Sequence, residues 1–123
     1  MGLPSNELMI FHGLCEDLAP DALAAVRERV RAYVLELEAA QSRSEFVAID
    51  LAKHVGDRLE RVLALAPGMS AAERALVVGA ARYFTSKDDA IPDMRACTGL
   101  DDDVRIVNHV LRQLGRDEWL IEE

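Results

Sequence analysis

Four aspartates that lie close together in the sequence are the residues with the most readily stated chemistry. Asp89 and Asp93 precede Gly99, and Asp102 and Asp103 follow it. Carboxylate oxygens are the ligands that hard cations such as Mg²⁺ and Ca²⁺ prefer, so the four form a candidate metal site. The spacing is not that of an EF-hand, because no bidentate glutamate follows at the required offset.

The same segment also has a purely structural interpretation. Pro92 favours extended backbone before it and interrupts any helix. Gly99 suits a position with positive φ. Asp101 or Asp102 can cap the last helix, and Asp103 would then lie in its positively polarised first turn. This interpretation predicts that Asp102 and Asp103 start the last helix, and it stands beside the metal hypothesis as an open alternative.

Charge gives the segment a third interpretation, as a docking loop. Residues 83–103 contain six acidic and two basic side chains, a local net charge of −4, in a chain whose net charge is −8. Such a surface favours a protein partner with a basic patch and disfavours direct contact with nucleic acid or anionic lipid. The candidate docking residues are Ser86, Asp88, Asp89, Ile91, Asp93, Met94 and Arg95.

These interpretations give three function hypotheses. The first is a small acidic interaction or regulatory module that presents the loop from Ser86 to Asp103 to a protein partner. The second is a divalent-metal-binding domain or metal-dependent enzyme that uses Asp89, Asp93, Asp102 and Asp103. The third is an acidic mimic of nucleic acid that inhibits a DNA- or RNA-binding protein.

Other patterns that indicate catalysis or metal binding are absent from the sequence. His12, His54 and His109 each stand alone, so no zinc or di-iron spacing is formed. Cys15 and Cys97 are far apart, and each is expected to pack as a small apolar residue in a reducing compartment. There is no nucleophile elbow and no phosphate-binding loop. The sequence favours a non-enzymatic role, and no catalytic residue is predicted.

Apolar residues recur at spacings of three and four throughout the chain, and no alternating strand pattern occurs. The pattern predicts an all-α fold, a single compact bundle of about five helices with an irregular acidic loop before the last long helix. The bundle occupies one domain, residues 1–123. The expected helices cover residues 6–14, 21–40, 45–66, 71–84 and a last stretch from the Asp102–Asp103 pair to 114.

Three local features carry further expectations. Ser70 and Glu73 have the spacing of a capping box at the start of the fourth helix. Gly79 lies among alanines, which predicts the close approach of another helix. Trp119, the one tryptophan, is expected to dock on the bundle.

Composition is typical of a globular protein, with 50% hydrophobic and 29% charged residues. No stretch approaches the roughly 20 apolar residues that a membrane-spanning helix needs. The start of the chain lacks the basic and apolar regions of a signal peptide. We therefore expect a cytoplasmic protein without a membrane span, and homo-oligomerisation remains an option.

The acidic segment resembles the YkvA-like family, a bacterial domain of unknown function. The matching positions are Tyr83, Ser86, Asp89, Ile91-Pro92-Asp93, Gly99 and Asp102-Asp103. With the flanking helices, the resemblance covers about residues 70–115 and implies the same helical layout. The family usually has proline where this chain has Lys87, and an apolar run where it has residues 94–98. That run suggests membrane proximity in relatives, and Arg95 and Thr98 point to a soluble version here.

Overall fold

The structure is a computed structural model that describes residues 5–41, 49–85 and 97–121. The α-helices are α1 (Ser5–Leu14), α2 (Pro20–Gln41), α3 (Ile49–Leu65), α4 (Ala71–Thr85) and α5 (Cys97–Gln113). Two short 3₁₀ turns, η1 (Ala66–Gly68) and η3 (Asp117–Trp119), follow α3 and α5. The described residues contain no strand, so the predicted all-α fold with five helices is confirmed.

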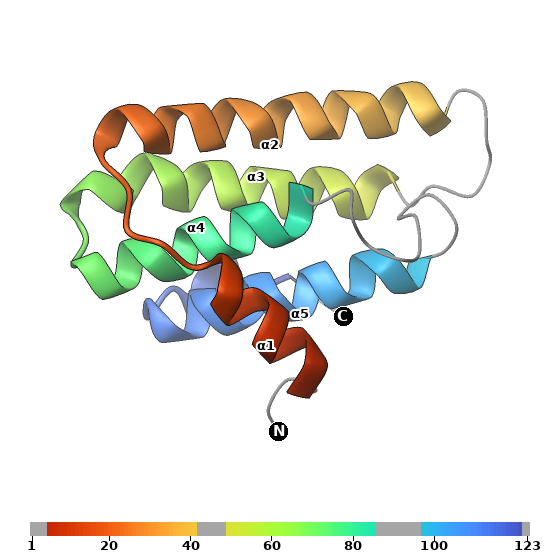
Figure 1. Cartoon of the computed structure of the whole chain (residues 1–123). Coiled ribbons are helices and arrows are strands. Elements are labelled where there is room, and N and C mark those ends of the chain that lie inside the picture. Colours follow the sequence, from red (N-terminus) through yellow and green to blue (C-terminus); the bar gives the residue numbers. More distant parts are fainter. Residues whose placement is uncertain (1–4, 42–48, 86–96, 122–123) are drawn as a thin grey trace.

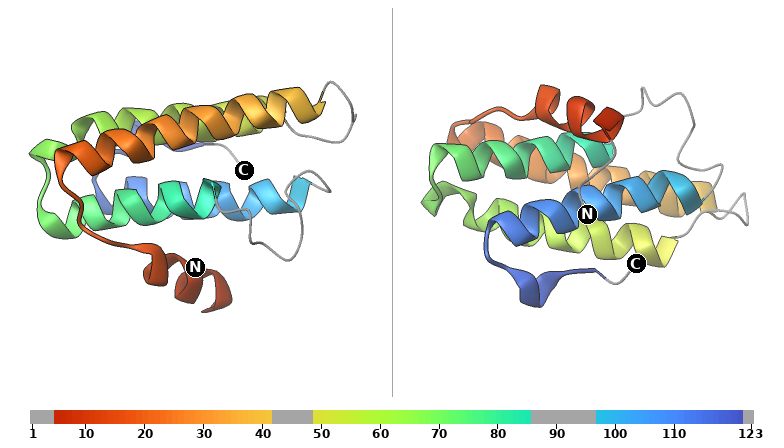
Figure 2. Two further views of the ribbon diagram at one scale, coloured as in Figure 1. Left: turned by 45° about the horizontal axis from the view of Figure 1, so that its top comes forward. Right: turned by 90° about the horizontal axis from the view of Figure 1, so that it is seen from below.

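The helices form two layers with a short helix on the outside. Helices α2 and α3 pack side by side in one layer, and α4 and α5 form the second (Figure 1). Helix α1 lies across the outer side of the second layer, mainly against α4 (Figure 2). Helices α2 to α5 surround a common core, to which α1 contributes Phe11.

The apolar stripes read from the sequence are the faces that the helices bury. On α2 the stripe supplies Val30 and Tyr33 to the core, and on α3 it supplies Leu59. Phe84 at the end of α4 and Leu111 on α5 are almost completely buried. Burial of large aliphatic and aromatic side chains contributes about 1.5–3 kcal/mol each, so these stripes are the main source of the fold's stability.

The turn between α3 and α4 follows the predicted chemistry. Pro67 and Gly68 lie in η1, directly after α3. The backbone N–H of Ser70 donates to Oε1 of Glu73 at 3.0 Å, and the N–H of Glu73 donates to Oγ of Ser70 at 3.2 Å. These reciprocal bonds satisfy two backbone donors at the start of α4, so the capping box is confirmed.

Gly79 permits the close packing of α1 on α4 that the sequence predicts. A Cβ at this position would lie 3.0 Å from Cε1 of Phe11 and 3.2 Å from Cα of Cys15. Such contacts are tighter than a packed interior normally allows. A second close approach, which the sequence reading missed, occurs at Gly56 on α3, where a Cβ would lie 2.7 Å from Cγ2 of Val34 on α2.

No helix within residues 5–41, 49–85 and 97–121 combines the length and the apolar character needed to cross a membrane.

Candidate functional site

The predicted docking loop lies outside the described residues. This applies to all seven of its side chains, Ser86, Asp88, Asp89, Ile91, Asp93, Met94 and Arg95. The structure does describe the two helices that hold the loop, because α4 ends at Thr85 and α5 begins at Cys97. The docking role of the loop therefore stays a prediction. The helices on either side of it can be described.

The start of α5 differs from the sequence prediction. Helix α5 begins at Cys97, so Asp102 and Asp103 are its sixth and seventh residues and neither starts it. Gly99 lies within the first turn of this helix. The predicted capping role of the aspartate pair is therefore wrong. Helical backbone extends about five residues further towards the acidic loop than the local aspartate signal indicated.

The metal hypothesis loses part of its support from the same change. One of its four candidate ligands, Asp103, is the seventh residue of α5. Asp103 is only 2% exposed. In the described part of the chain, no group of three or more histidine, cysteine, aspartate or glutamate side chains is placed to hold a metal ion. Asp89 and Asp93 lie outside that part.

The stem on the α4 side of the loop is held firmly against α2. Phe84 is fully buried, and its ring meets the ring of Tyr33 edge-on with centroids 5.0 Å apart. Arg29 of α2 donates through Nη2 to the backbone oxygen of Thr85 at 3.5 Å. The guanidinium of Arg29 also lies 5.7 Å from the centre of the Tyr33 ring. These contacts fix the last turn of α4, from which the chain leaves.

On the α5 side, the helix that follows the loop is buried from its seventh residue, Asp103, onwards at several positions. Val104, Ile106 and Val107 belong to the core and are at most 2% exposed. Asp103 is buried beside them. This aspartate therefore belongs to the bundle rather than to an exposed docking surface, which corrects its predicted place in the loop.

Charged side chains on the described bundle are extensively paired. Ion pairs between described residues include eight basic and eight acidic side chains. The pairs are Arg29–Glu36, Arg31–Glu28, Arg31–Glu60, Lys53–Glu38, Arg58–Asp57, Arg61–Asp57, Arg74–Asp17, Arg82–Glu16 and Arg116–Glu118. Most of these pairs are exposed, so each contributes little to stability, but together they neutralise much of the bundle surface.

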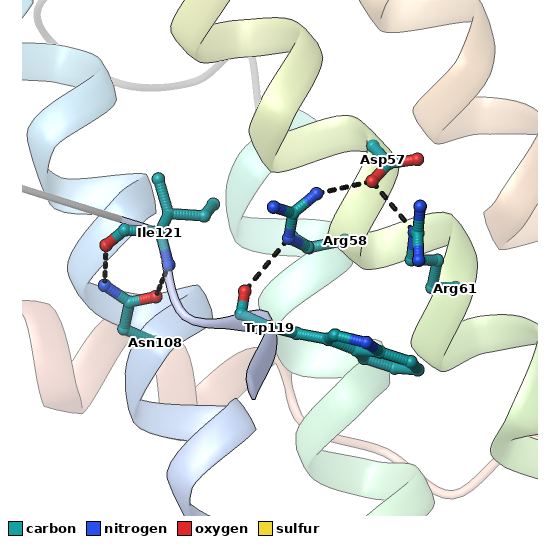
Figure 3. Close-up of polar contacts among 6 residues, drawn as sticks. All are labelled: Asp57, Arg58, Arg61, Asn108, Trp119 and Ile121. Carbon is teal, nitrogen blue, oxygen red and sulfur yellow. Dashed lines mark hydrogen bonds and ion pairs between the residues drawn. The ribbon is translucent and has the colours of Figure 1, made fainter. Parts of the chain in front are cut away.

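The C-terminal segment is anchored by a buried asparagine that the sequence reading missed. Asn108 is 1% exposed on α5. Its Nδ2 donates to the backbone oxygen of Ile121 at 2.8 Å, and its Oδ1 accepts from the backbone N–H of Ile121 at 2.8 Å (Figure 3). One side chain thus satisfies both backbone groups of Ile121. The signal available in the sequence was a polar residue at helical spacing from the apolar residues Val104 and Leu111.

Trp119 docks on the bundle as predicted. Its backbone oxygen accepts from Nε of Arg58 at 2.9 Å (Figure 3). The guanidinium groups of Arg61 and Arg116 lie 5.8 Å and 5.1 Å from the centre of its ring. Asp57 accepts from both Arg58 and Arg61 on α3, which holds these arginines in place beneath the tail.

Two histidines that stand alone in the sequence are brought together by the fold. His12 on α1 and His109 on α5 both lie beside Phe11, with ring centroids 5.2 Å and 6.1 Å from it. Burial lowers the pKa of His109, and the neighbouring charges of His12 and Arg112 lower this pKa further. His54, in contrast, is exposed on α3 and apart from these two.

A small surface cavity lies where the α1–α2 connection meets η1 and α4. It encloses about 290 Å³ and is lined by Asp17, Leu18, Ala19, Pro20, Leu23, Pro67 and Arg74. Nε of Arg74 donates to Oδ1 of Asp17 at 2.7 Å, and this bond holds the pKa of Asp17 below its usual value. Arg74 also donates to the backbone oxygen of Met69. The two charged side chains that line the cavity, Asp17 and Arg74, are therefore paired with each other.

Cys15 packs as a small residue, as its isolation in the sequence predicts. It is half-buried, and its Sγ donates to the backbone oxygen of Phe11 at 3.3 Å. Burial raises the pKa of this thiol, which Arg82 lowers in part. Since the thiolate is the reactive form, the raised pKa makes Cys15 a poor nucleophile near neutral pH.

No family model matches the chain, and comparison with curated proteins and with solved structures likewise finds no match.

Proposed function

We propose that this chain is an acidic helical interaction module of the YkvA-like type, which docks on a basic protein partner through residues 86–96. The proposal keeps the predicted docking residues Ser86 to Arg95 and leaves Asp103 in the bundle, where it is buried.

The distribution of charge is the observation that carries the proposal. The ion pairs on the described bundle balance eight basic side chains with eight acidic ones. Half of the net charge of −8 falls within residues 83–103, with −1 in the docking segment 86–96 and −3 in Asp101, Asp102 and Asp103 at its α5 side. Concentrated charge of this kind steers a partner of opposite sign and raises its association rate. A nucleic-acid mimic would instead need unpaired acidic groups spread along the surface of the bundle.

The supports of the loop favour the same role. Binding loops are commonly positioned by a rigid scaffold, because a fixed stem limits the conformational entropy lost when a partner binds. Here Phe84 and Thr85 fix the end of α4, and Val104 and Ile106 anchor the body of α5, the helix that follows the loop. A short chain between these two anchored helices is therefore suited to present Ile91 and Met94 next to acidic residues.

The contribution of charge to the association rate and that of apolar contacts to the dissociation rate can be measured separately with the partner. Reversing Asp88 and Asp89 to lysine should slow association about tenfold at low salt and flatten its salt dependence. Met94→Ala should mainly speed dissociation, by about tenfold, because buried apolar side chains hold a complex together. Surface plasmon resonance measures both rates. The proposal fails if the charge reversal leaves the association rate unchanged.

Metal titration separates the docking module from the competing metal site. The docking account expects no saturable change in melting temperature with Mg²⁺, Ca²⁺ or Mn²⁺ up to millimolar concentration. A cation that binds the native state raises the free energy of unfolding in proportion to the logarithm of its concentration. If calorimetry shows stoichiometric cation binding, and Asp89→Asn or Asp93→Asn abolishes it, the metal-binding hypothesis is favoured over the docking hypothesis.

A further inference from the structure

Helix α1 packs mainly against α4 and touches α5 more lightly, and the one fully buried side chain among its described residues is aromatic. Phe11 is fully buried between Gly79 of α4 and His109 of α5. In contrast, Met9 and Ile10 on the same helix are 73% and 53% exposed. The docking of α1 on α4 and α5 therefore depends strongly on Phe11 and on the residues that contact its ring.

The surroundings of Phe11 contain His12, His109 and Arg112, so a proton on His109 adds positive charge beside other basic side chains. His109 meets the Phe11 ring edge-on at 88°, and the neighbouring His12 ring is tilted at 43° to it. Arg112 follows His109 by three residues on α5, and Arg105 precedes it by four, so both share its side of the helix. A charge on His109 would face His12 from α1 and Arg112 from its own helix.

Helix α4 does not offset this charge. Its basic residue at this contact, Arg82, donates to the backbone oxygen of Leu14 at 3.2 Å and pairs with Glu16 at 2.9 Å. Glu16 is thus already engaged. The charged neighbours that act on His109 are His12 and Arg112, and both are basic.

We propose that α1 is a pH-gated cover, which leaves α4 and α5 when His109 is protonated while the other helices stay folded. The proposal is independent of the docking loop. Undocking uncovers the Gly79 face of α4, which α1 otherwise closes.

The direction of the pH dependence follows from linkage. The pKa of His109 in the docked state lies below the ordinary value of 6.5, which applies again once α1 has left and the ring is solvated. Docking is therefore fully stabilised above about pH 6.5 and is lost as the pH falls through the lowered docked-state pKa. Over that interval, each opening takes up a proton.

The connection to α2 limits the release to α1 itself. Glu16 pairs with Arg82, and Asp17 pairs with Arg74. Arg74 holds the pKa of Asp17 below its usual value, so this pair persists at mildly acidic pH. The chain after Leu14 thus stays tethered, and α1 can return when the pH rises.

Amide hydrogen exchange on the full chain tests the gate. From about pH 7.5 to about pH 5.5, protection of residues 9–14, corrected for intrinsic exchange, should fall by up to about tenfold per pH unit. Protection of residues 55–63 in α3 should change much less. His109→Gln should abolish the pH step in α1, whereas His54→Gln, at an exposed histidine on α3, should leave it intact.

Besides an absent pH step in the wild type, two results would overturn the gate. One is a pH step in α1 that persists in His109→Gln. The other is loss of protection in α3 together with α1, which would mean global unfolding. Where His109→Gln lowers helicity in circular dichroism, His12→Gln serves in its place, because it removes the facing charge from an exposed position.

Discussion

Replacement of Gly79 by alanine is expected to lower the free energy of unfolding by about 1–3 kcal/mol, although alanine is the better helix former. The added methyl group would collide with Cys15 and would lie 3.0 Å from Cε1 of Phe11. The thiol can rotate away, but Cα of Cys15, at 3.2 Å, is backbone. Helix α1 would have to shift away from α4 as a whole.

Two other glycines provide matched controls for this substitution. Gly13 in α1 has no atom within 4 Å of an added Cβ, so Gly13→Ala should be neutral or stabilise by up to about 1 kcal/mol. At Gly56 the obstacle is a side-chain methyl of Val34, so Gly56→Ala should give an intermediate loss. Chemical denaturation measures all three. Equal stability of Gly79→Ala and Gly13→Ala would show that α1 does not pack against Gly79.

Asn108→Ala is expected to destabilise the fold by about 2–4 kcal/mol, because it removes both partners of the buried backbone groups of Ile121. Each buried group left unsatisfied costs about 1–3 kcal/mol. The C-terminal segment should then separate from α3 and α5, carrying Trp119 into water. Since Trp119 is the one tryptophan of the chain, its emission should shift to longer wavelength.

A second amide on the same helix controls for this change. Gln113 is exposed at the end of α5, and Gln113→Ala should change stability by no more than about 0.5 kcal/mol. Asn108→Asp keeps the acceptor for the N–H of Ile121 but places a carboxylate oxygen against its carbonyl oxygen, so it should also destabilise. Unchanged tryptophan emission in Asn108→Ala would contradict the anchoring role.

The helices could be predicted because their signals are local. Apolar spacing placed Val30, Leu59 and Leu111 on buried faces, and the residue types at Ser70 and Glu73 specified a helix start. The close approach at Gly79 could be inferred from the small residues around it. Each of these features depends on residues within about two helical turns, so the sequence contains the needed information.

The start of α5 could not be read in the same way. Aspartate caps helices well, but it is also tolerated within them, so residue type alone does not locate the first turn. Asp103 lies inside the helix and is buried beside Val104 and Ile106. Packing of α5 on the bundle thus outweighs the local preference of aspartate for a capping position.

Contacts between segments that are distant in the chain also could not be predicted from the sequence. Asn108 meets Ile121, and His12 meets His109 through Phe11. No local pattern indicates these partners, because they depend on how α1 and the C-terminal segment lie against α5. For the docking loop, the sequence supplies composition and a family resemblance, and its residues remain predictions.

Capture of a partner from a lysate of the native host, compared among three forms of the chain, tests the docking function most directly. The forms are the wild type, Asp88→Lys with Asp89→Lys, and a control with Asp117→Lys and Glu118→Lys. The control also reverses an adjacent exposed pair. It lies beyond the far end of α5, a helix about 25 Å long.

The docking account predicts that the wild type and the control retain the same protein in equal amounts at low salt, and that the loop variant retains about tenfold less. Equal loss from both variants would indicate unspecific attraction to acidic charge. Retention by the loop variant at the wild-type level would contradict the account, because the working surface would then lie outside residues 86–96.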